Sequence, residues 1–295
     1  MLLAYLQLAG AMALAGATVA IAKPVVAVVP VCVFGVLRFA IASAILVPLA
    51  LRAGQPRQAT RRDLAAAVLL AFFGAFLFTV LILEGVARTS AIDAAVITST
   101  IPAATLLLSA AVLREPLTLR RGGAVMLATL GIAVVALEDA AGGGVRSLVG
   151  NLLVVGAVFS EAMFTVLAKR LGATLAPVPL AAIASVSATM MFLPIAAGEV
   201  ARDGWPAIDA GTWGLIVFYS TAGSVVAFLL WFQGLRRVDA GVAGAFTALI
   251  PVSGALVAVL ALGERFTLAH LVALALALLA IALATRAGRP ATGSG

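Results

Sequence analysis

Residues Gly85–Thr118 read GVARTSAIDAAVITSTIPAATLLLSAAVLREPLT, an apolar run with a proline at its centre and a charged turn at its end. The landmarks of this stretch recur at one constant offset of 149 residues. The matched pairs are Gly85 and Gly234, Arg88 and Arg237, Thr98 and Thr247, Pro102 and Pro251, Glu115 and Glu264, and Thr118 and Thr267. One offset shared by so many special residues indicates an internal repeat, so the chain is expected to contain two copies of one unit.

The composition excludes a water-soluble globular protein. Hydrophobic residues make up 64% of the 295 residues, charged residues make up 11%, and the mean hydropathy is +1.21. A soluble domain carries roughly 25% charged and about 45–50% apolar residues. The net charge of +7 could indicate a nucleic-acid partner, but Lys and Arg concentrated in the inner loops of a membrane protein explain it better. We therefore expect an integral membrane protein that has the lipid bilayer as a partner and binds no nucleic acid.

Ten apolar runs approach the length of about 20 residues that a helix needs to cross a bilayer. They cover about 2–23, 31–51, 64–83, 91–113, 119–137, 150–170, 178–197, 211–232, 240–262 and 268–285. With the N-terminus inside, thirteen Lys and Arg residues fall in inner segments and five in outer segments. This asymmetry follows the positive-inside rule and places both termini in the cytoplasm. We therefore expect a multi-pass protein of a bacterial inner membrane.

The repeat divides these runs into two sets of five. Because five is odd, the second set enters the membrane in the opposite orientation, which is a transporter architecture. We expect a first five-helix repeat at 1–141, a second, inverted repeat at 142–288, and a linker-like tail at 289–295. The first two runs match the second half at an offset of 146, with Ala17–Lys23 against Met163–Lys169. The fold class predicted is thus an all-α membrane protein of ten transmembrane helices.

Pro102 and Pro251 fall near the centres of the two apolar runs that contain them. Because proline has no backbone N–H, the carbonyls of Thr98 and Thr247 lose their usual helical partners. Near mid-membrane, such carbonyls must be buried against protein or face water. One interpretation is a packing kink relieved by a neighbour. The other, favoured by the pairing, is two hinges beside a cavity.

Glu161 is the most informative single residue, because it lies near the centre of the run 150–170. An acidic residue at that depth costs about 2.5–3.5 kcal/mol on insertion scales. A structural ion pair or a neutral, hydrogen-bonded acid is one interpretation. The other is a carboxyl that faces a cavity and binds an amino group or a proton. Thr165 lies one turn further on the same face.

Arg38 and the aromatic residues complete the candidates within spans. Arg38 lies about two turns from the outer end of its run, so its simplest interpretation is snorkelling towards that interface. Trp231 lies near one end of the run 211–232 and is expected at the membrane interface. Tyr219, Ser224 and Phe228 form a mixed polar and aromatic stripe, for which packing and cavity lining both remain open.

Motifs for enzymatic chemistry are absent from the sequence. One cysteine, Cys32, and one histidine, His270, exclude an intramolecular disulfide and a multi-histidine metal site. The chain has neither G-x-x-x-x-G-K-[ST] nor H-E-x-x-H, and no nucleophile–base pair surrounds Cys32 or His270. We expect no enzyme activity, no ATP-driven pumping within this chain, no cofactor and no metal.

Several motifs resemble the EamA-type repeat of the drug/metabolite transporter superfamily. They are Leu37-Arg38-Phe39, Ala22-Lys23 at the end of the first run, LREPLT at 113–118 and its echo LGERFT at 262–267. The resemblance implies a basket of ten helices around a central cavity lined by spans one, three, four, six, eight and nine. It also implies export of small metabolites by alternating access. Within the superfamily the chain is most similar to YddG-type exporters of aromatic and other neutral amino acids.

The functional hypothesis is therefore an exporter of aromatic and other neutral amino acids. A multidrug or organic-cation exporter of the same fold is the alternative, because a buried acid suits cations too. The candidate cavity residues are Glu161, Thr165, Phe78, Thr98, Tyr219, Ser224, Phe228 and Thr247, with hinges at Pro102 and Pro251.

Overall fold

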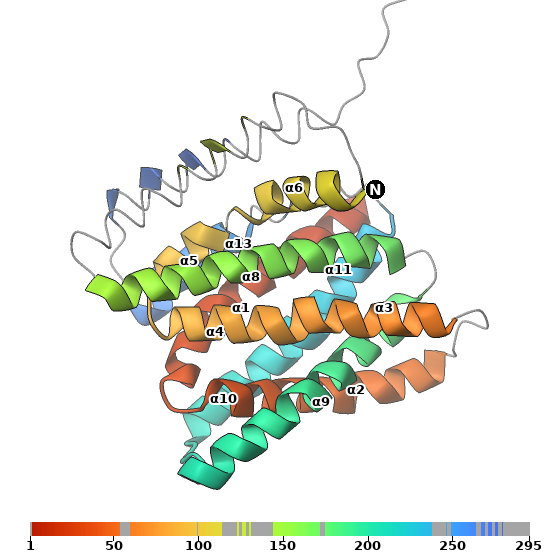
Figure 1. Cartoon of the computed structure of the whole chain (residues 1–295), viewed down its shortest axis with the longest axis horizontal. Coiled ribbons are helices and arrows are strands. Elements are labelled where there is room, and N and C mark those ends of the chain that lie inside the picture. The colour runs from red at the N-terminus through yellow and green to blue at the C-terminus, as the bar shows by residue number, and fades with distance from the viewer. Residues whose placement is uncertain are drawn as a thin grey trace, which may run out of the picture.

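The computed structural model describes residues 2–53, 60–98, 100–113, 144–171, 175–237 and 249–263, together with isolated positions at 123–130, 246 and 267–279. All the regular structure in these residues is helical, as expected (Figure 1). The helices are α1 (Leu2–Val26), α2 (Val31–Ala53), α3 (Arg61–Ala71), η1 (Phe72–Leu77), α4 (Phe78–Val86), α5 (Ala91–Thr98), α6 (Ile101–Leu113), α8 (Gly144–Leu171), α9 (Pro177–Asp203), α10 (Ala210–Phe218), η2 (Tyr219–Val226), α11 (Ala227–Leu235) and α13 (Leu249–Leu262).

Six helical segments in the described part of the chain are long and apolar enough to cross a membrane. They are Leu2–Val26, Val31–Ala53, Arg61–Val86, Leu148–Ala168, Pro177–Asp203 and Ala210–Leu235. Each coincides with one of the apolar runs, which confirms a multi-pass membrane protein. The runs expected at 119–137 and 268–285 lie largely outside the described residues, so the total of ten and the inversion of the halves stay predictions.

Two membrane-length helices begin at side-chain caps. Thr60 and Asp63 form a capping box before α3, in which each side chain binds the backbone N–H of the other residue. Asp209 caps α10 by accepting from the backbone N–H and the hydroxyl of Thr212, at 2.9 and 2.8 Å. These hydrogen bonds, the backbone one first, hold the pKa of Asp209 below its ordinary value. The caps fix where the chain enters the apolar region.

The expected fourth span is divided into two helices. Helix α5 ends at Thr98 and α6 begins at Ile101, while Thr100 turns back and donates its N–H to the carbonyl of Ile97 at 3.0 Å. Pro102 is the second residue of α6, a position where a missing N–H removes no intrahelical bond. The predicted disturbance at Pro102 is thus a helix break just before it, and its action as a hinge stays a prediction.

Two helices contain a π-helical segment in their middle, which periodicity did not predict. In the first, the N–H of Phe78 binds the carbonyl of Phe73, and in the second the N–H of Ala227 binds that of Ala222. The two donors are separated by 149 residues, and so are the two acceptors. Segments η1 and η2 therefore fall at matched positions of the sequence repeat. Such π segments are often found at functional sites.

Helix α1 runs through the middle of the bundle (Figure 1). It packs against α13, α11, η2, α4 and α5, while α2 pairs with α9 and α4 with α8. Glycines permit the closest of these approaches, as small residues do in membrane bundles. A Cβ atom at Gly16 of α1 would overlap the carbonyl group of Ile250 in α13, and one at Gly74 of η1 would overlap the ring of Phe164 in α8.

We predict that Gly16→Ala destabilises the protein, because the neighbouring group is helix backbone and cannot rotate away. Overpacking of this kind costs about 1–3 kcal/mol, which thermal unfolding in detergent will show as a lower midpoint. Gly198→Ala in α9 is the matched control, since nothing lies within 4 Å of its added Cβ. Equal midpoints for the two variants would contradict the close approach of α1 and α13.

Candidate functional site

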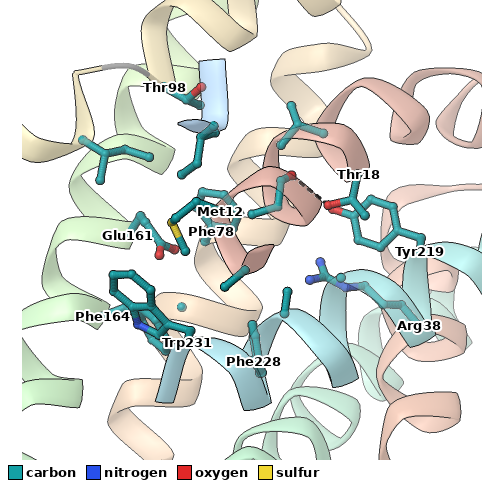
Figure 2. Close-up of a pocket in the computed structure, with 18 residues that line it drawn as sticks. Met12, Thr18, Arg38, Phe78, Thr98, Glu161, Phe164, Tyr219, Phe228 and Trp231 are labelled. Atoms are coloured by element: carbon teal, nitrogen blue, oxygen red, sulfur yellow. Dashed lines mark hydrogen bonds between the residues drawn. The ribbon is translucent and has the colours of Figure 1, made fainter. Parts of the chain in front are cut away.

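A cavity lies inside the bundle where α1 meets the irregular parts of its neighbours (Figure 2). Its unfilled space amounts to about 680 Å³, including the part that is open to solvent. The lining residues come from α1, α2, η1, α4, α5, α6, α8, η2, α11 and α13. They are Ala11, Met12, Ala15, Thr18, Val19, Arg38, Gly74, Phe78, Thr98, Ile101, Glu161, Phe164, Tyr219, Gly223, Ala227, Phe228, Trp231 and Ile250.

Glu161 places a carboxylate on one wall of this cavity. It projects from α8, the helix that also contributes Phe164. The neighbouring Ser160 donates its hydroxyl to the carbonyl of Phe73 in η1 at 2.7 Å, which fixes this turn of α8 against the π segment. Within the described part of the chain, the Glu161 carboxylate makes no hydrogen bond and no ion pair. This carboxylate is attracted across the cavity by the charge of Arg38 but is not bonded to it, and it can therefore bind a group that enters the cavity.

Arg38 brings a positive charge to the same cavity from α2 (Figure 2). Its side chain is held on several sides. Nε donates to Oγ of Ser224 at 2.6 Å and Nη1 donates to Oγ1 of Thr79 at 2.9 Å. The guanidinium carbon lies 4.5 Å from the ring centroids of both Phe39 and Tyr219, within the range of cation–π attraction.

Aromatic rings form much of the remaining wall. Phe164 and Phe228 stack with their centroids 6.1 Å apart, and both contact Phe232 at 5.9 Å. Figure 2 shows Phe164, Trp231 and Phe228 together at one side of the cavity, with Phe78 nearer its middle. The arrangement offers ring faces and edges to an apolar or aromatic group of a ligand.

The structure brings five of the predicted cavity residues to this site: Glu161, Phe78, Thr98, Tyr219 and Phe228 line it. Ser224 lies one layer behind, where it accepts the hydrogen bond from Arg38. Thr165 is buried on α8 and is not among the lining residues. Thr247 lies outside the described residues, as do the side chains of Pro102 and Pro251.

Two expectations about the membrane interface were wrong. Arg38 does not snorkel outwards: it is 5% exposed, because two hydroxyls and two rings inside the bundle stabilise its charge. Trp231 does not face outwards as an interface residue would, but is buried in the cavity wall. The sequence already contained the evidence for Arg38. Like Glu161, it is a charged residue inside an apolar run, and such residues usually face the interior of the bundle or a cavity.

Comparison with known proteins agrees with this architecture. The EamA-like transporter family matches residues 2–137 and again 148–286. The uncharacterized transporter YetK of Bacillus subtilis (strain 168) is 33% identical over 276 residues, which cover 92% of this chain and 83% of that protein. An uncharacterized transporter of Archaeoglobus fulgidus is 27% identical over 250 residues, covering 85% of this chain and 87% of that protein.

A solved crystal structure shares the fold. It superposes with a TM-score of 0.69 at 20% sequence identity, and the match covers 98% of this chain and 99% of that chain. The two family matches together span nearly the whole sequence, and the relatives are named as transporters, which are not a class of enzymes. The chain therefore belongs to the EamA-like transporter family of the drug/metabolite transporter superfamily, as a multi-pass membrane protein for small-molecule transport.

Proposed function

We propose that the protein exports neutral amino acids, aromatic ones above all, across a bacterial inner membrane by alternating access. In this proposal the chain forms two inverted five-helix repeats, at 1–141 and 142–288, with both termini in the cytoplasm. The cavity between the repeats holds the substrate. The positive-inside asymmetry of the sequence supports the orientation, and the matched landmarks at an offset of 149 residues support the repeats.

The observation that carries the proposal is the Glu161 carboxylate, which has no hydrogen bond or ion pair among the described residues and lies in an aromatic-walled cavity. A carboxylate at this depth needs a counter-charge, and the ammonium group of an amino acid provides one. Phe78, Phe164, Phe228 and Trp231 supply apolar surface for the substrate side chain. The pairing of one charge with several rings selects a small molecule that is cationic at one end and apolar at the other.

The interruptions of the helices suggest how access could alternate. Thr98 and Ile101 flank the break between α5 and α6 and both line the cavity, as do Gly74 of η1 and Gly223 of η2. We infer that the bundle bends at these interruptions, with Pro102 and Pro251 as hinges. Few regular hydrogen bonds must then be broken when the cavity opens to the other side.

Organic cations are the second candidate substrates. The same carboxylate attracts a protonated amine, and the rings of Phe228 and Trp231 can stabilise it by cation–π attraction. Uptake of labelled phenylalanine into proteoliposomes separates the two candidates. Competition by phenylalanine and threonine but not by organic cations supports amino-acid export, and the reverse pattern supports the alternative. Repeating the assay with and without a proton gradient will show whether protons drive the flux.

We predict that Glu161→Gln lowers phenylalanine uptake by about tenfold or more, because a hydrogen bond to a charged group contributes about 1.5–3 kcal/mol. The amide keeps the shape of the side chain and removes only its charge. Asp203→Asn, an exposed acid at the end of α9, is the matched control and should transport normally. Unchanged flux in Glu161→Gln would remove this residue from the mechanism.

We predict that Phe228→Ala weakens phenylalanine binding more than threonine binding. The lost ring contacts are worth about 0.5–1.5 kcal/mol, or roughly two- to tenfold in the half-saturating concentration. Phe218→Ala is the control, since that ring, at the end of α10, is 44% exposed and is not among the residues that line the cavity. An equal loss for both amino acids would indicate that Phe228 only maintains the packing of α11.

A further inference from the structure

We propose that Arg38 binds the carboxylate of the substrate, so that the cavity recognises a zwitterion by both of its charges. This inference rests on the proposed function, because it takes the cavity as the substrate site and Glu161 as the partner of the ammonium group. It adds a second recognition group and a substrate class. A ligand must carry an anionic group beside its cationic one.

The first support is the rigidity of the guanidinium. Three elements hold it: α2 carries it, Thr79 of α4 and Ser224 of η2 accept its hydrogen bonds, and Tyr219 of η2 covers it with a ring. A side chain that is 5% exposed and bonded on both Nε and Nη1 cannot swing away from the cavity. Preorganised donors of this kind bind an anion without an ordering cost at the moment of binding.

The second support is the donor that remains. Nη2 of Arg38 has no hydrogen-bond partner among the described residues, and the side chain lines the cavity. Guanidinium groups favour carboxylates because their planar N–H donors match the two oxygens. Both acceptors that Arg38 has in the protein are neutral hydroxyls. Its positive charge therefore lacks a bonded anion. A buried charge without such a partner is costly, and a substrate carboxylate would reduce this cost.

The third support is the placement of the two charges. Arg38 and Glu161 enter the cavity from opposite sides, with Met12 and Phe78 drawn between them (Figure 2). They attract each other across the cavity but form no ion pair with each other in the described structure. A ligand can therefore bind to each of them, and their opposite charges offset each other within the site. A zwitterion satisfies both, whereas a simple amine satisfies Glu161 and leaves Arg38 uncompensated.

A purely structural role for Arg38 makes a different prediction. The same bonds join α2, α4 and η2, so replacing the arginine could weaken the bundle. In that case all ligands would lose affinity together. A carboxylate-binding role instead changes the preference between ligands that do and do not carry a carboxylate. The deciding measurement is therefore a ratio of affinities.

The first experiment needs no variant. Binding of labelled phenylalanine to the purified full-length protein is competed with phenethylamine, which lacks the carboxylate, and with 3-phenylpropionate, which lacks the ammonium group. We expect each analogue to bind at least about tenfold more weakly than phenylalanine, because each leaves one buried charge unpaired. Phenethylamine that competes as well as phenylalanine would overturn the role of Arg38 while leaving Glu161 and the transport of amines intact.

The second experiment measures the Kd of labelled phenylalanine and of labelled phenethylamine for Arg38→Gln, Arg38→Lys and the exposed control Arg202→Gln. We expect Arg38→Gln to weaken phenylalanine by about tenfold or more while phenethylamine binds as before, and Arg38→Lys to restore part of the preference. An Arg38→Gln protein that still prefers phenylalanine to the same degree would overturn the inference. If this variant fails to fold, the wild-type ligand series decides alone.

The two levels of the proposal fail differently. If neither phenylalanine nor threonine binds or is transported, the proposed function is wrong. If phenylalanine binds but the carboxylate contributes nothing to its affinity, only the assignment of Arg38 is wrong.

Discussion

The structure is governed by the requirement that backbone polar groups inside a bilayer find partners within the protein. Regular helices meet this requirement by themselves, so irregular backbone is tolerated only where it is buried or borders a cavity. The described chain follows this constraint closely. The break after Thr98 and the π segments η1 and η2 all border the same cavity. The carbonyl of Phe73 accepts the π-helical bond from Phe78 and a second hydrogen bond from Ser160, the residue before Glu161. Irregular backbone and the candidate site thus occupy one place.

The buried charges obey the same constraint in different ways. Arg38 is stabilised by hydroxyls and by the faces of two rings, which compensate part of its lost hydration without an anion. Glu161 has no such support in the described structure and depends on the cavity itself. A bundle that only needed stability would pair the two charges or replace both by apolar residues, which is often neutral or favourable. Their separation is more easily explained by a ligand than by packing.

Sequence reasoning found most of the helices, and five of its eight predicted cavity residues line the cavity, for clear physical reasons. Apolar runs of membrane length identify spans reliably, because in lipid the backbone of such a run must satisfy its own hydrogen bonds and therefore forms a helix. Glu161 stood out because a charge in such a run is rare. The π segments did not stand out, since no residue type demands them. They also alter the helical spacing, which is why Ser224 was expected in the cavity but lies behind Arg38. Arg38 and Trp231 were misplaced because distance from a span end does not reveal which way a side chain faces.

The two charges lie at positions that the two halves of the sequence do not share. At the offset of 146 residues that relates the first spans to the second half, Arg38 corresponds to Ala184 and Glu161 corresponds to Ala15. Each half therefore contributes one charge where the other half has alanine. Gly74 and Gly223, in contrast, correspond at the offset of 149 residues, and both border the cavity. These two shared glycines let neighbouring helices approach closely. Features that differ are those that give the cavity opposite charges on its two sides, and such an asymmetry is what an oriented, doubly charged substrate requires.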